Sequence, residues 1–401
     1  MRNVLEKCGF PVVPSSNFLI GNLDVMKDER TPFRFEELRQ KYGKTYAIMQ
    51  GAFPTIVTSD VDLIQEICLK KFRYFHSRMT DPTSGDPDKS RGVHVFAARG
   101  ERWKRIRTVT SPALSTQNLR NISKLSTYYA TFQLFTTIRD SVDRFIDGLL
   151  EDNNNSAPIE LHRLLLDFSI FIGYREEDFD FLQFLKNVED NEWNGWRTSN
   201  DVRTDISTIK IDRKMTAEEI VEQMRFLSTA GFDTTANTLT YLTYLLAIHA
   251  DKQQKLRDEI DECDELCFDV INQLNYLQWC IAETLRLFPH ASLLQSRRCV
   301  EDCEASSFKF KRGINIAFDT WSLHHDREVW GEDAGEFRPE RFADRNSEQL
   351  KSWTPFGVGP RMCIGMRFAL LEIKTAMFQI MKNFRILKAT PSDQVSIIVI
   401  A

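Results

Sequence analysis

The sequence contains no long apolar run: nowhere do roughly eighteen consecutive apolar residues occur, the length that a membrane-spanning helix needs. The first ten residues are short and mixed in character, so we do not expect a secretory signal. A net charge of −5 over 401 residues gives no electrostatic reason to expect nucleic-acid binding. The hydrophobic content of 42% is enough for a large core.

Cysteine is scarce and scattered. The eight cysteines do not form a dense disulfide framework, and their spread suits a reducing compartment. Two pairs, Cys263 with Cys267 and Cys299 with Cys303, lack matching histidines or a Cys-x-x-Cys spacing. We therefore do not expect a structural zinc site.

The most informative stretch surrounds one cysteine. Residues 356–365 read Phe-Gly-Val-Gly-Pro-Arg-Met-Cys-Ile-Gly, and glycine is needed where the backbone turns tightly or approaches a ligand. Apolar residues then recur at helical spacing, at Met366, Leu370, Ile373, Met377, Ile380 and Phe384. The pattern predicts that Cys363 lies on a tight loop that opens into an amphipathic helix.

That position has chemical consequences for Cys363. A helix N-terminus offers unpaired N–H groups and a positive dipole end, which favour a thiolate over a thiol. A thiolate suits a soft transition metal and is one of the axial ligands of haem iron. Arg361 would supply a positive charge for an acidic group nearby. A lone cysteine is more often a small buried apolar residue, but the surrounding pattern argues against that interpretation here.

The pattern Phe356-x-x-Gly359-x-Arg361-x-Cys363-x-Gly365 resembles the haem-binding signature of the cytochrome P450 family. The resemblance implies haem b (iron protoporphyrin IX) as the cofactor. It also implies that Cys363 is the axial ligand of the iron and that Phe356 and Arg361 contact the haem.

A second motif lies on a helix predicted from Glu101 onward. Trp103 and Arg107 are four residues apart and therefore share a helical face, which by itself indicates a packed aromatic ring beside a solvated charge. The pair resembles the W-x-x-x-R helix of the same family, whose side chains bind a haem propionate. Arg297 is our choice for a second propionate contact, and the adjacent Arg298 is the alternative.

A long central helix is predicted next. Thr216 and Glu219 form a capping-box pattern before an apolar periodicity that continues to about Ile248. Residues 230–235, Ala-Gly-Phe-Asp-Thr-Thr, are poor helix formers and should weaken the helix locally, which a simple packing notch would also explain. The stretch resembles the family's oxygen-activation groove. The resemblance implies that Thr234 steadies dioxygen and its water, and that Asp233 feeds protons toward it.

A third set is structural. Residues 274–287 are predicted to form a helix closed by a proline, and Glu283 and Arg286 are three apart on one face of it, which alone would suggest a surface ion pair. With Arg341 of the later Pro-Glu-Arg-Phe segment, they resemble the family's buried triad, to which we assign a structural role. The pair His324 and His325 is expected on a solvated loop, since no third metal ligand is suitably spaced.

The remaining pattern predicts a mainly α protein with a smaller β region. Helices are expected at 36–42, 60–70 and 119–150, and a hairpin at 46–49 and 55–58. Short strands are expected around 297–299, within 309–317 and at 397–401, and a loop at 80–92. Residues 159–213 show no readable period.

The resemblance extends from about residue 10 to the end and implies a single haem domain, 1–401. It is nearest to eukaryotic microsomal members. Relative to them, the N-terminal anchor is absent, the region 155–213 looks shortened, and the C-terminus looks truncated.

The resemblance implies a monooxygenase that inserts one atom of O2 into a lipophilic substrate such as a steroid, fatty acid or xenobiotic. Electrons would come from NADPH through a flavoprotein reductase. The protein would lie at the cytosolic face of the endoplasmic reticulum membrane, with possible peripheral membrane contact. One alternative is a haem-binding relic or regulatory protein without turnover. Another is a helical interaction protein without haem, which would require all the motifs to be coincidental.

Overall fold

The computed structural model describes residues 5–6, 8–15, 17, 19–26, 30–79, 86–115, 134–153, 214–290, 294–388 and 397–400. Of the predicted elements, residues 119–133 of one helix lie outside these ranges, as does the stretch 159–213.

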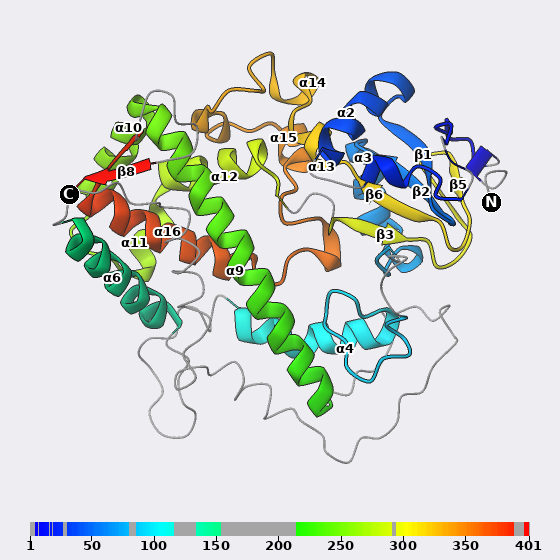
Figure 1. The fold of residues 1–401 in the computed structure, drawn as a ribbon, viewed down its shortest axis with the longest axis horizontal. Coiled ribbons are helices and arrows are strands. Elements are labelled where there is room, and N and C mark those ends of the chain that lie inside the picture. Colours follow the sequence, from blue (N-terminus) through cyan, green and yellow to red (C-terminus); the bar gives the residue numbers. More distant parts are fainter. Residues whose placement is uncertain are drawn as a thin grey trace.

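Most of the described chain is helical, which confirms the predicted fold class (Figure 1). The α-helices are α2 (Thr31–Tyr42), α3 (Val61–Gln65), α4 (Gly100–Thr110), α6 (Leu134–Asn153), α9 (Ala217–Ile248), α10 (Ala250–Asp261), α11 (Phe268–Gln273), α12 (Asn275–Leu287), α13 (Thr320–His324), α14 (Arg327–Trp330), α15 (Ser347–Ser352) and α16 (Met366–Asn383). Shorter turns of helix are η1 (Leu23–Met26), the π-helical η2 (Glu66–Lys70), η3 (Phe72–Tyr74), η4 (Ser111–Leu114), η6 (Pro339–Phe342) and η7 (Gly359–Arg361).

The described strands form one small sheet and two ribbons. The sheet has the order β1-β2-β6-β3, built from β1 (Thr45–Gln50), β2 (Phe53–Thr58), β6 (Asn315–Phe318) and β3 (Ser296–Arg298). β2 and β6 are parallel, and the other neighbours are antiparallel. The ribbons pair β4 (Cys303–Ala305) with β5 (Phe308–Phe310), and β7 (Arg385–Lys388) with β8 (Ile397–Ile400).

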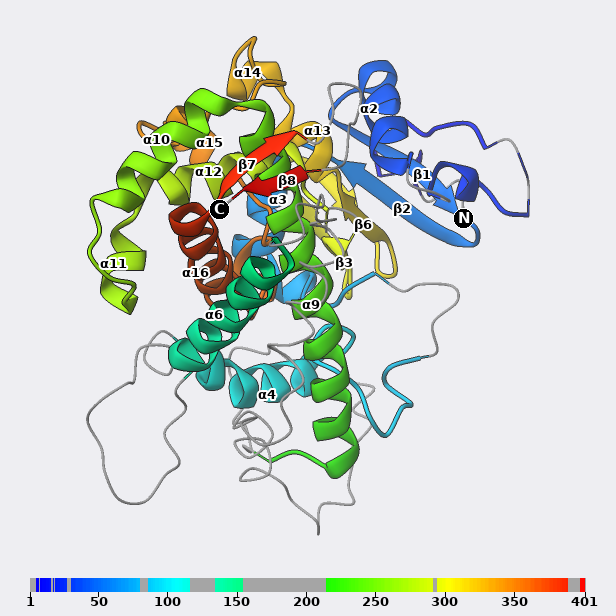
Figure 2. The same ribbon diagram turned by 60° about the vertical axis from the view of Figure 1, so that its left-hand side comes forward.

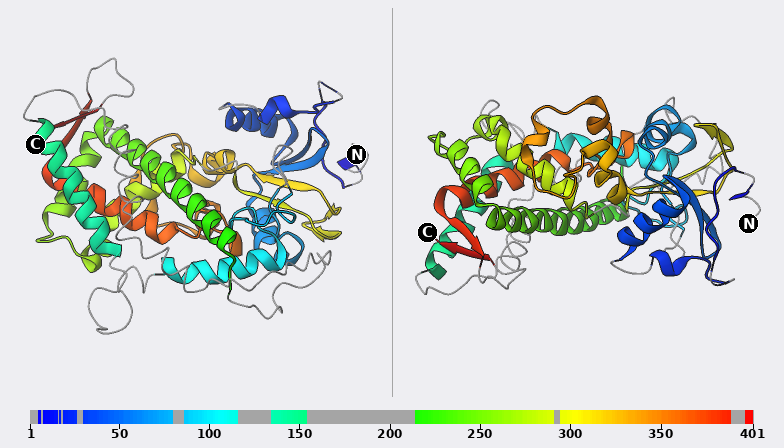
Figure 3. Two further views of the ribbon diagram at one scale, coloured as in Figure 1. Left: turned by 60° about the horizontal axis from the view of Figure 1, so that its bottom comes forward. Right: turned by 90° about the horizontal axis from the view of Figure 1, so that it is seen from above.

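Helix α9 crosses the molecule between these parts. The sheet lies on the side of the N-terminus, whereas α6, α10, α11, α12 and α16 gather on the side of the C-terminus (Figures 1 and 2). Seen from above, α9 runs along one face of the helical part (Figure 3, right). Helix α9 therefore lies between the sheet and the helical part and serves as the reference for describing both.

Two apolar clusters hold these parts together. One joins the helices on the C-terminal side and includes Ile138, Leu242, Leu277 and Met377, each with no exposed surface. The other lies under the sheet and includes Ile56 and Ile316 with the side chains of α3 and η2. Each such side chain contributes about 1.5–3 kcal/mol when fully buried. Burial of apolar surface thus fixes the frame in which the polar groups described below are held.

Several predicted elements are confirmed. The hairpin of β1 and β2 occurs as expected, β8 forms at the C-terminal end, and the cap of α3 is made by Asp60, whose carboxylate accepts from the N–H groups of Asp62 and Leu63. Helix α12 ends at Leu287, directly before Phe288-Pro289. The predicted helix 60–70 is in fact two pieces, α3 and the π-helical η2. Helices α10 and α11 were not predicted, because they follow α9 after a single residue or are very short.

Among the described residues, no helix combines the length and the apolar character needed to cross a lipid bilayer.

The start of α9 carries a buried carboxylate. Thr216 accepts a hydrogen bond from the Glu219 N–H, and the Glu219 side chain accepts one from the Thr216 N–H, which confirms the capping box. Glu219 has no exposed surface and also accepts from Arg102 Nε at 2.9 Å and from an Arg105 Nη at 2.7 Å. Both arginines belong to α4, so one carboxylate fixes α4 against the first turn of α9.

We expect the substitution Glu219→Gln to destabilise the fold by about 3 kcal/mol, since it removes the negative charge that two buried guanidinium groups share. Urea unfolding followed by circular dichroism measures the change. Glu218→Gln is the matched control, because Glu218 is adjacent but exposed and should leave the unfolding midpoint nearly unchanged. Equal losses in the two variants would contradict this role of Glu219.

Candidate haem-binding site

The loop before α16 has the shape that its glycines predicted. Gly357 and Gly359 have φ values of 78° and 75°, a region in which side-chain-bearing residues are strained. A Cβ atom added to Gly359 would lie 2.3 Å from the carbonyl oxygen of Cys68, so only glycine fits this approach. The Cys363 N–H donates to the Phe356 carbonyl at 2.8 Å, which closes the loop.

Cys363 stands at the end of this loop, two residues before the cap of α16. All eight cysteines lie among the described residues, and all are free. Cys363 is the exposed one. Protein nevertheless surrounds it closely enough that burial raises the pKa of its thiol. A side chain has both properties when it faces a space that protein bounds on most sides. Beside Cys363, a Cβ atom added at Gly365 would meet no atom of the described residues within 4 Å.

The prediction that this setting favours the thiolate is wrong for the protein alone. The N–H groups of Gly365 and Met366 and the charges of Arg107 and Arg78 do lower the pKa of Cys363, as the helix N-terminus suggested. Burial acts in the opposite direction and is the largest influence, so the net pKa of the thiol is raised. A metal ion would have to supply the remaining stabilisation of the thiolate.

Four arginines, called the arginine cluster below, lie close to one another: Arg78, Arg107, Arg297 and Arg361. Arg78 and Arg107 also act on the Cys363 sulfur. They influence one another electrostatically, and burial lowers the pKa of each, that of Arg78 to about 9. Within the described residues none of the four forms an ion pair with a carboxylate. Four cations without an anion are an arrangement that a dianionic ligand would stabilise.

Arg361 is the fixed centre of this cluster. It is 3% exposed and donates to the carbonyls of His76, Val95, Phe96 and Ala98, so its guanidinium is held by backbone. The sequence predicted an acidic group near Arg361. Among the described residues its neighbours are instead carbonyl oxygens and the other arginines.

Trp103 and Arg107 lie on α4, on the face turned toward the cluster. The Arg361 guanidinium lies 4.3 Å from the centroid of the Trp103 ring, and Phe72 packs edge-on against the same ring. Trp103 is 5% exposed, so the ring is packed as its spacing predicted. The guanidinium of Arg107 makes no hydrogen bond to another described residue, and the sulfur of Cys363 attracts it. Arg107 is therefore available for a ligand.

Arg297 and Arg298 point in different directions from β3. Arg297 is 2% exposed, donates to the Val358 carbonyl at 2.9 Å, and has a buried Nε without a partner. Arg298 is half-buried and interacts with Asp86 and Asp88, outside the cluster. The geometry favours Arg297 as the propionate contact, and the assignment remains a prediction.

Sequence reasoning missed Arg78. It donates to the Leu294 and Arg361 carbonyls, its guanidinium stacks over Phe96 at 3.9 Å, and its buried Nε lacks a partner. Arg78 lies in a stretch without helical or strand period, so no sequence pattern marks it. Only the isolated bridge between Ser77 and Arg298 brings it beside β3.

The notch predicted in α9 does not interrupt the helix, which is continuous over 32 residues. The Thr234 hydroxyl donates to the Ala230 carbonyl at 2.7 Å, so the expected competition for backbone carbonyls does occur. A Cβ atom added to Gly231 would meet no atom of the described residues within 4 Å. Asp233 is exposed.

The third predicted set is brought together in the core. Glu283 accepts from Arg286 Nε at 2.7 Å and from Arg341 Nε at 2.8 Å, and all three side chains are buried. Arg286 also donates to the carbonyls of His324 and Ala334 at 2.8 Å. The triad thereby ties α12 to the segment that leads into the loop of Cys363.

The expectation that His324 and His325 lie on a solvated loop is wrong. His324 ends helix α13 with no exposed surface, and burial lowers its pKa to about 3, so the ring is neutral. Its Nε2 accepts from the Thr354 N–H at 3.0 Å, two residues before Phe356. His325 stacks on Trp321 with ring centroids 4.1 Å apart. The pair therefore supports the fold beside the Cys363 loop.

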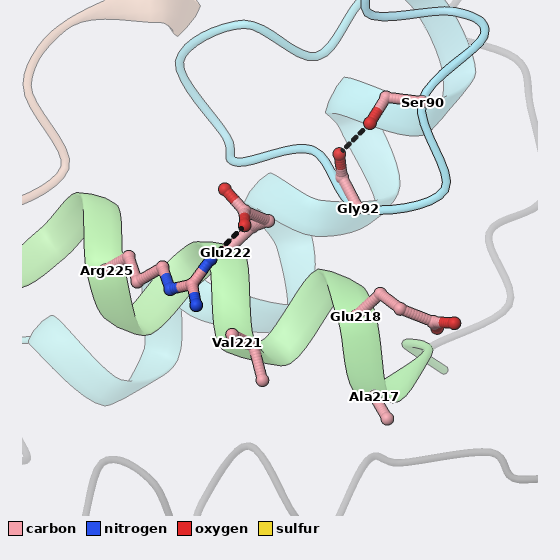
Figure 4. A pocket seen from close by; sticks show the side chains of 7 residues that line it. All are labelled: Ser90, Gly92, Ala217, Glu218, Val221, Glu222 and Arg225. Carbon is pink, nitrogen blue, oxygen red and sulfur yellow. Dashed lines mark hydrogen bonds and ion pairs between the residues drawn. The ribbon is translucent and has the colours of Figure 1, made fainter.

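A surface pocket lies elsewhere, between the 86–99 segment and the first turns of α9 (Figure 4). Ser90, Gly92, Ala217, Glu218, Val221, Glu222 and Arg225 line it. Glu222 and Arg225 pair with each other at 3.2 Å. None of the predicted site residues lines this pocket, so it is separate from the candidate site.

Glu372 on α16 is a further buried group that the sequence did not indicate. It is 2% exposed, and burial raises its pKa to about 8. The hydroxyl of Thr235, next to Thr234 on α9, interacts with the Glu372 carboxyl and lowers its pKa. No charged side chain shifts this pKa. Thr235 Oγ1 forms no hydrogen bond of normal geometry. At neutral pH Glu372 is thus a protonated acid packed under the notch.

This protonation predicts a pH dependence of stability. The unfolded carboxyl has its ordinary pKa of 4.5 and the folded one about 8, so the folded state binds the extra proton between these values. Stability should fall as the pH rises through this window, by about 1.4 kcal/mol per pH unit, and level off above it. Glu372→Gln should remove this dependence.

Thermal unfolding of both proteins between pH 5 and about 9 measures the effect. Glu332→Gln is the control, because its side chain is 89% exposed, and it should follow the wild type. Parallel pH curves for wild type and Glu372→Gln would show that the carboxyl is already ionised at neutral pH.

Comparison with known proteins identifies the family. The family model described as "Cytochrome P450" matches residues 11–175 and 176–398. Putative cytochrome P450 CYP13A8 of Caenorhabditis elegans is 30% identical over 456 residues, covering 91% of this chain and 87% of the relative. Putative cytochromes P450 CYP13A5 and CYP13A2 of the same organism are 30% and 31% identical, and cover 96% and 92% of this chain and 88% and 87% of the relatives. The family model matches nearly the whole chain. Cys363, the glycine loop before it and the arginine cluster also lie in one place. The chain therefore belongs to the cytochrome P450 family.

Proposed function

We propose that this chain inserts one oxygen atom of O2 into a lipophilic substrate, with Cys363 as the axial thiolate ligand of haem iron. As a member of its family it is a haem-thiolate monooxygenase and binds haem b. The roles of individual residues, the class of substrate and the source of electrons are the proposed part. The observation that carries the proposal is the exposed Cys363 beside an arginine cluster that has no carboxylate partner among the described residues.

The residues present fit a haem. Its two propionates would neutralise the arginine cluster, with Trp103, Arg107 and Arg297 as contacts and Arg78 as an addition. Two of these arginines, Arg78 and Arg297, have buried Nε atoms without partners, which is what a missing anion would leave behind. Phe356 would contact the ring system, and Arg361 would act through the backbone and the Trp103 ring that it holds.

When bound, the haem supplies the activation of O2, which the thiolate assists by donating electron density to the iron. The chain's own contribution begins with the Cys363 loop, whose glycines and the Gly365 and Met366 N–H groups orient the sulfur. Glu283, Arg286 and Arg341 hold the preceding segment in place and have no chemical role.

Protons are the second contribution. Breaking an O–O bond to give water requires protons at the distal oxygen, and an alcohol beside an acid can hold and move them. The Thr234 hydroxyl, now donated to the Ala230 carbonyl, would turn toward a bound oxygen and a water. The exposed Asp233 carboxylate would take protons from solvent and pass them to Thr234.

The substrate class, partner and location are inferred from the family resemblance. We infer a steroid, fatty acid or xenobiotic substrate, electrons from NADPH through a flavoprotein reductase, and a place at the cytosolic face of the endoplasmic reticulum. The family model is matched in two parts that meet between residues 175 and 176, and the alignments to the relatives are longer than this chain. Both facts support the proposal that the region 155–213 is shortened relative to the family.

An activity assay tests the function. It combines the purified protein with NADPH, a flavoprotein reductase and a set of steroids, fatty acids and xenobiotics. Under 18O2, mass spectrometry should detect a product with one labelled oxygen atom. Normal haem binding without NADPH consumption for any substrate would favour the alternative, a haem-binding protein without turnover.

The assignment of Cys363 predicts a spectrum. The reduced protein under carbon monoxide should show the strongly red-shifted Soret band of thiolate ligation, and Cys363→Ala should lose it. Cys267→Ala is the control, since Cys267 is also partly accessible, and it should keep the band. Retention of the band in Cys363→Ala would exclude this sulfur as the ligand.

A further inference from the structure

Residues 92–98 lie along the first turns of α9 before they reach the arginine cluster. A Cβ atom added to Gly92 would lie 3.0 Å from the Glu218 carbonyl oxygen, so the backbone at this point lies directly against α9 (Figure 4). Val93 and Val95 follow, 4% and 5% exposed, and pack in an apolar cluster that joins α4 and α9. The segment is therefore seated on α9 by close contact and by burial.

One side chain of α9 forms hydrogen bonds with the backbone of this segment. Gln223 has no exposed surface, its Oε1 accepts from the Val95 N–H at 2.7 Å, and its Nε2 donates to the Val93 carbonyl at 2.9 Å. Nε2 also donates to the Glu219 carbonyl of the same helix at 3.0 Å. A side-chain amide offers two N–H donors and one carbonyl oxygen, and all of them are used here. The reversed amide would place its NH2 group against the Val95 N–H, so these partners also fix its orientation.

A ring contact accompanies these hydrogen bonds. The His94 imidazole stacks on Phe226, one turn further along α9 than Gln223, with ring centroids 4.3 Å apart and planes 2° from parallel. Apolar burial is non-directional, whereas a hydrogen bond weakens steeply when its angle changes. Gln223 therefore sets the position of residues 93–95 along α9, and the apolar contacts keep them against the helix.

Two members of the arginine cluster bind the same segment. Arg361 donates to the carbonyls of Val95 and Phe96, both at 3.3 Å, and the Arg78 guanidinium lies 3.9 Å from the centroid of the Phe96 ring. Val95 thus donates its N–H to Gln223, while its carbonyl accepts from Arg361. A displacement of this segment along α9 would therefore move two acceptors of Arg361 and the ring on which Arg78 stacks.

We propose that Gln223 is a positioning residue of the haem site, which fixes Arg361 and Arg78 through residues 92–98. This rests on the proposed function, in which the arginine cluster receives the two propionates. The Gln223 amide is used up by protein groups, so it acts through the segment and not by contact with the haem. Without it, the arginines would be held less accurately against the propionates, while Cys363 would still reach the iron.

Hydrogen exchange tests the first step. Gln223→Met keeps the side-chain length and removes both hydrogen bonds to the segment. Gln253→Met is the matched control, because Gln253 is also buried and its amide binds both the N–H and the carbonyl of Ile386 in β7. In the haem-loaded proteins, mass spectrometry should show faster amide exchange in peptides covering 92–98 for Gln223→Met only. Wild-type exchange of these peptides in Gln223→Met would overturn the proposal.

Haem release tests the second step. In Gln223→Met, transfer of haem to apomyoglobin should be faster by about tenfold, the effect of one or two lost hydrogen bonds. The propionate bending bands in the resonance Raman spectrum should shift, and the red-shifted carbon monoxide band should remain. Gln253→Met should lower the unfolding midpoint to a similar degree yet release haem at the wild-type rate. Equal release rates in the two variants would reduce Gln223 to a structural role.

Gly92→Ala supplies a second variant that leaves Gln223 in place. Its Cβ atom would push the segment away from the Glu218 carbonyl, so it should change haem release and the propionate bands in the same direction. Wild-type behaviour of both Gln223→Met and Gly92→Ala would refute the positioning role alone and leave the proposed function standing. A wild type without the red-shifted carbon monoxide band would instead overturn the proposed function, and the positioning role with it.

Discussion

Uncompensated positive charge is the constraint on which the rest of this structure depends. Four guanidinium groups are gathered in one place, two of them act on the Cys363 sulfur, and three of them donate to backbone carbonyls. Placing cations in a protein interior is costly unless an anion joins them. Each of the four arginines lies on a different element, so the fold holds them together before any ligand binds. The elements are the segment after η3, helix α4, strand β3 and the turn η7. In the proposed function, this arrangement receives the two propionates of haem and has its shape before the ligand arrives.

Two buried carboxylates keep that receptor in shape, although neither belongs to it. Glu219 fixes α4 to α9, and α4 carries Trp103 and Arg107. Glu283 fixes α12 to the segment that leads to the Cys363 loop. Each carboxylate is shared by two arginines, so each helix is positioned by charge as well as by apolar contact. The positions of the arginine cluster and of the sulfur are therefore set by ion pairs remote from the haem.

The sequence predicted those features that depend on neighbouring residues. The capping box of α9, the positive φ values of the glycine loop and the pairing of Glu283 with Arg286 follow from local spacing. Arg78 and the burial of His324 could not be predicted, because their partners are backbone groups from distant, aperiodic segments. The pKa of Cys363 was misjudged for a related reason: local N–H groups can be inferred from a helix start, but burial depends on the whole fold.

The exposure of Cys363 has a consequence for the life of the chain before it receives its cofactor. An accessible thiol can be oxidised to sulfinic or sulfonic acid, and neither form can ligate iron. Oxidation proceeds through the thiolate, and the raised pKa keeps that species scarce. If Cys363 is the proposed ligand, the same burial that opposes the anion preserves the sulfur until iron displaces its proton.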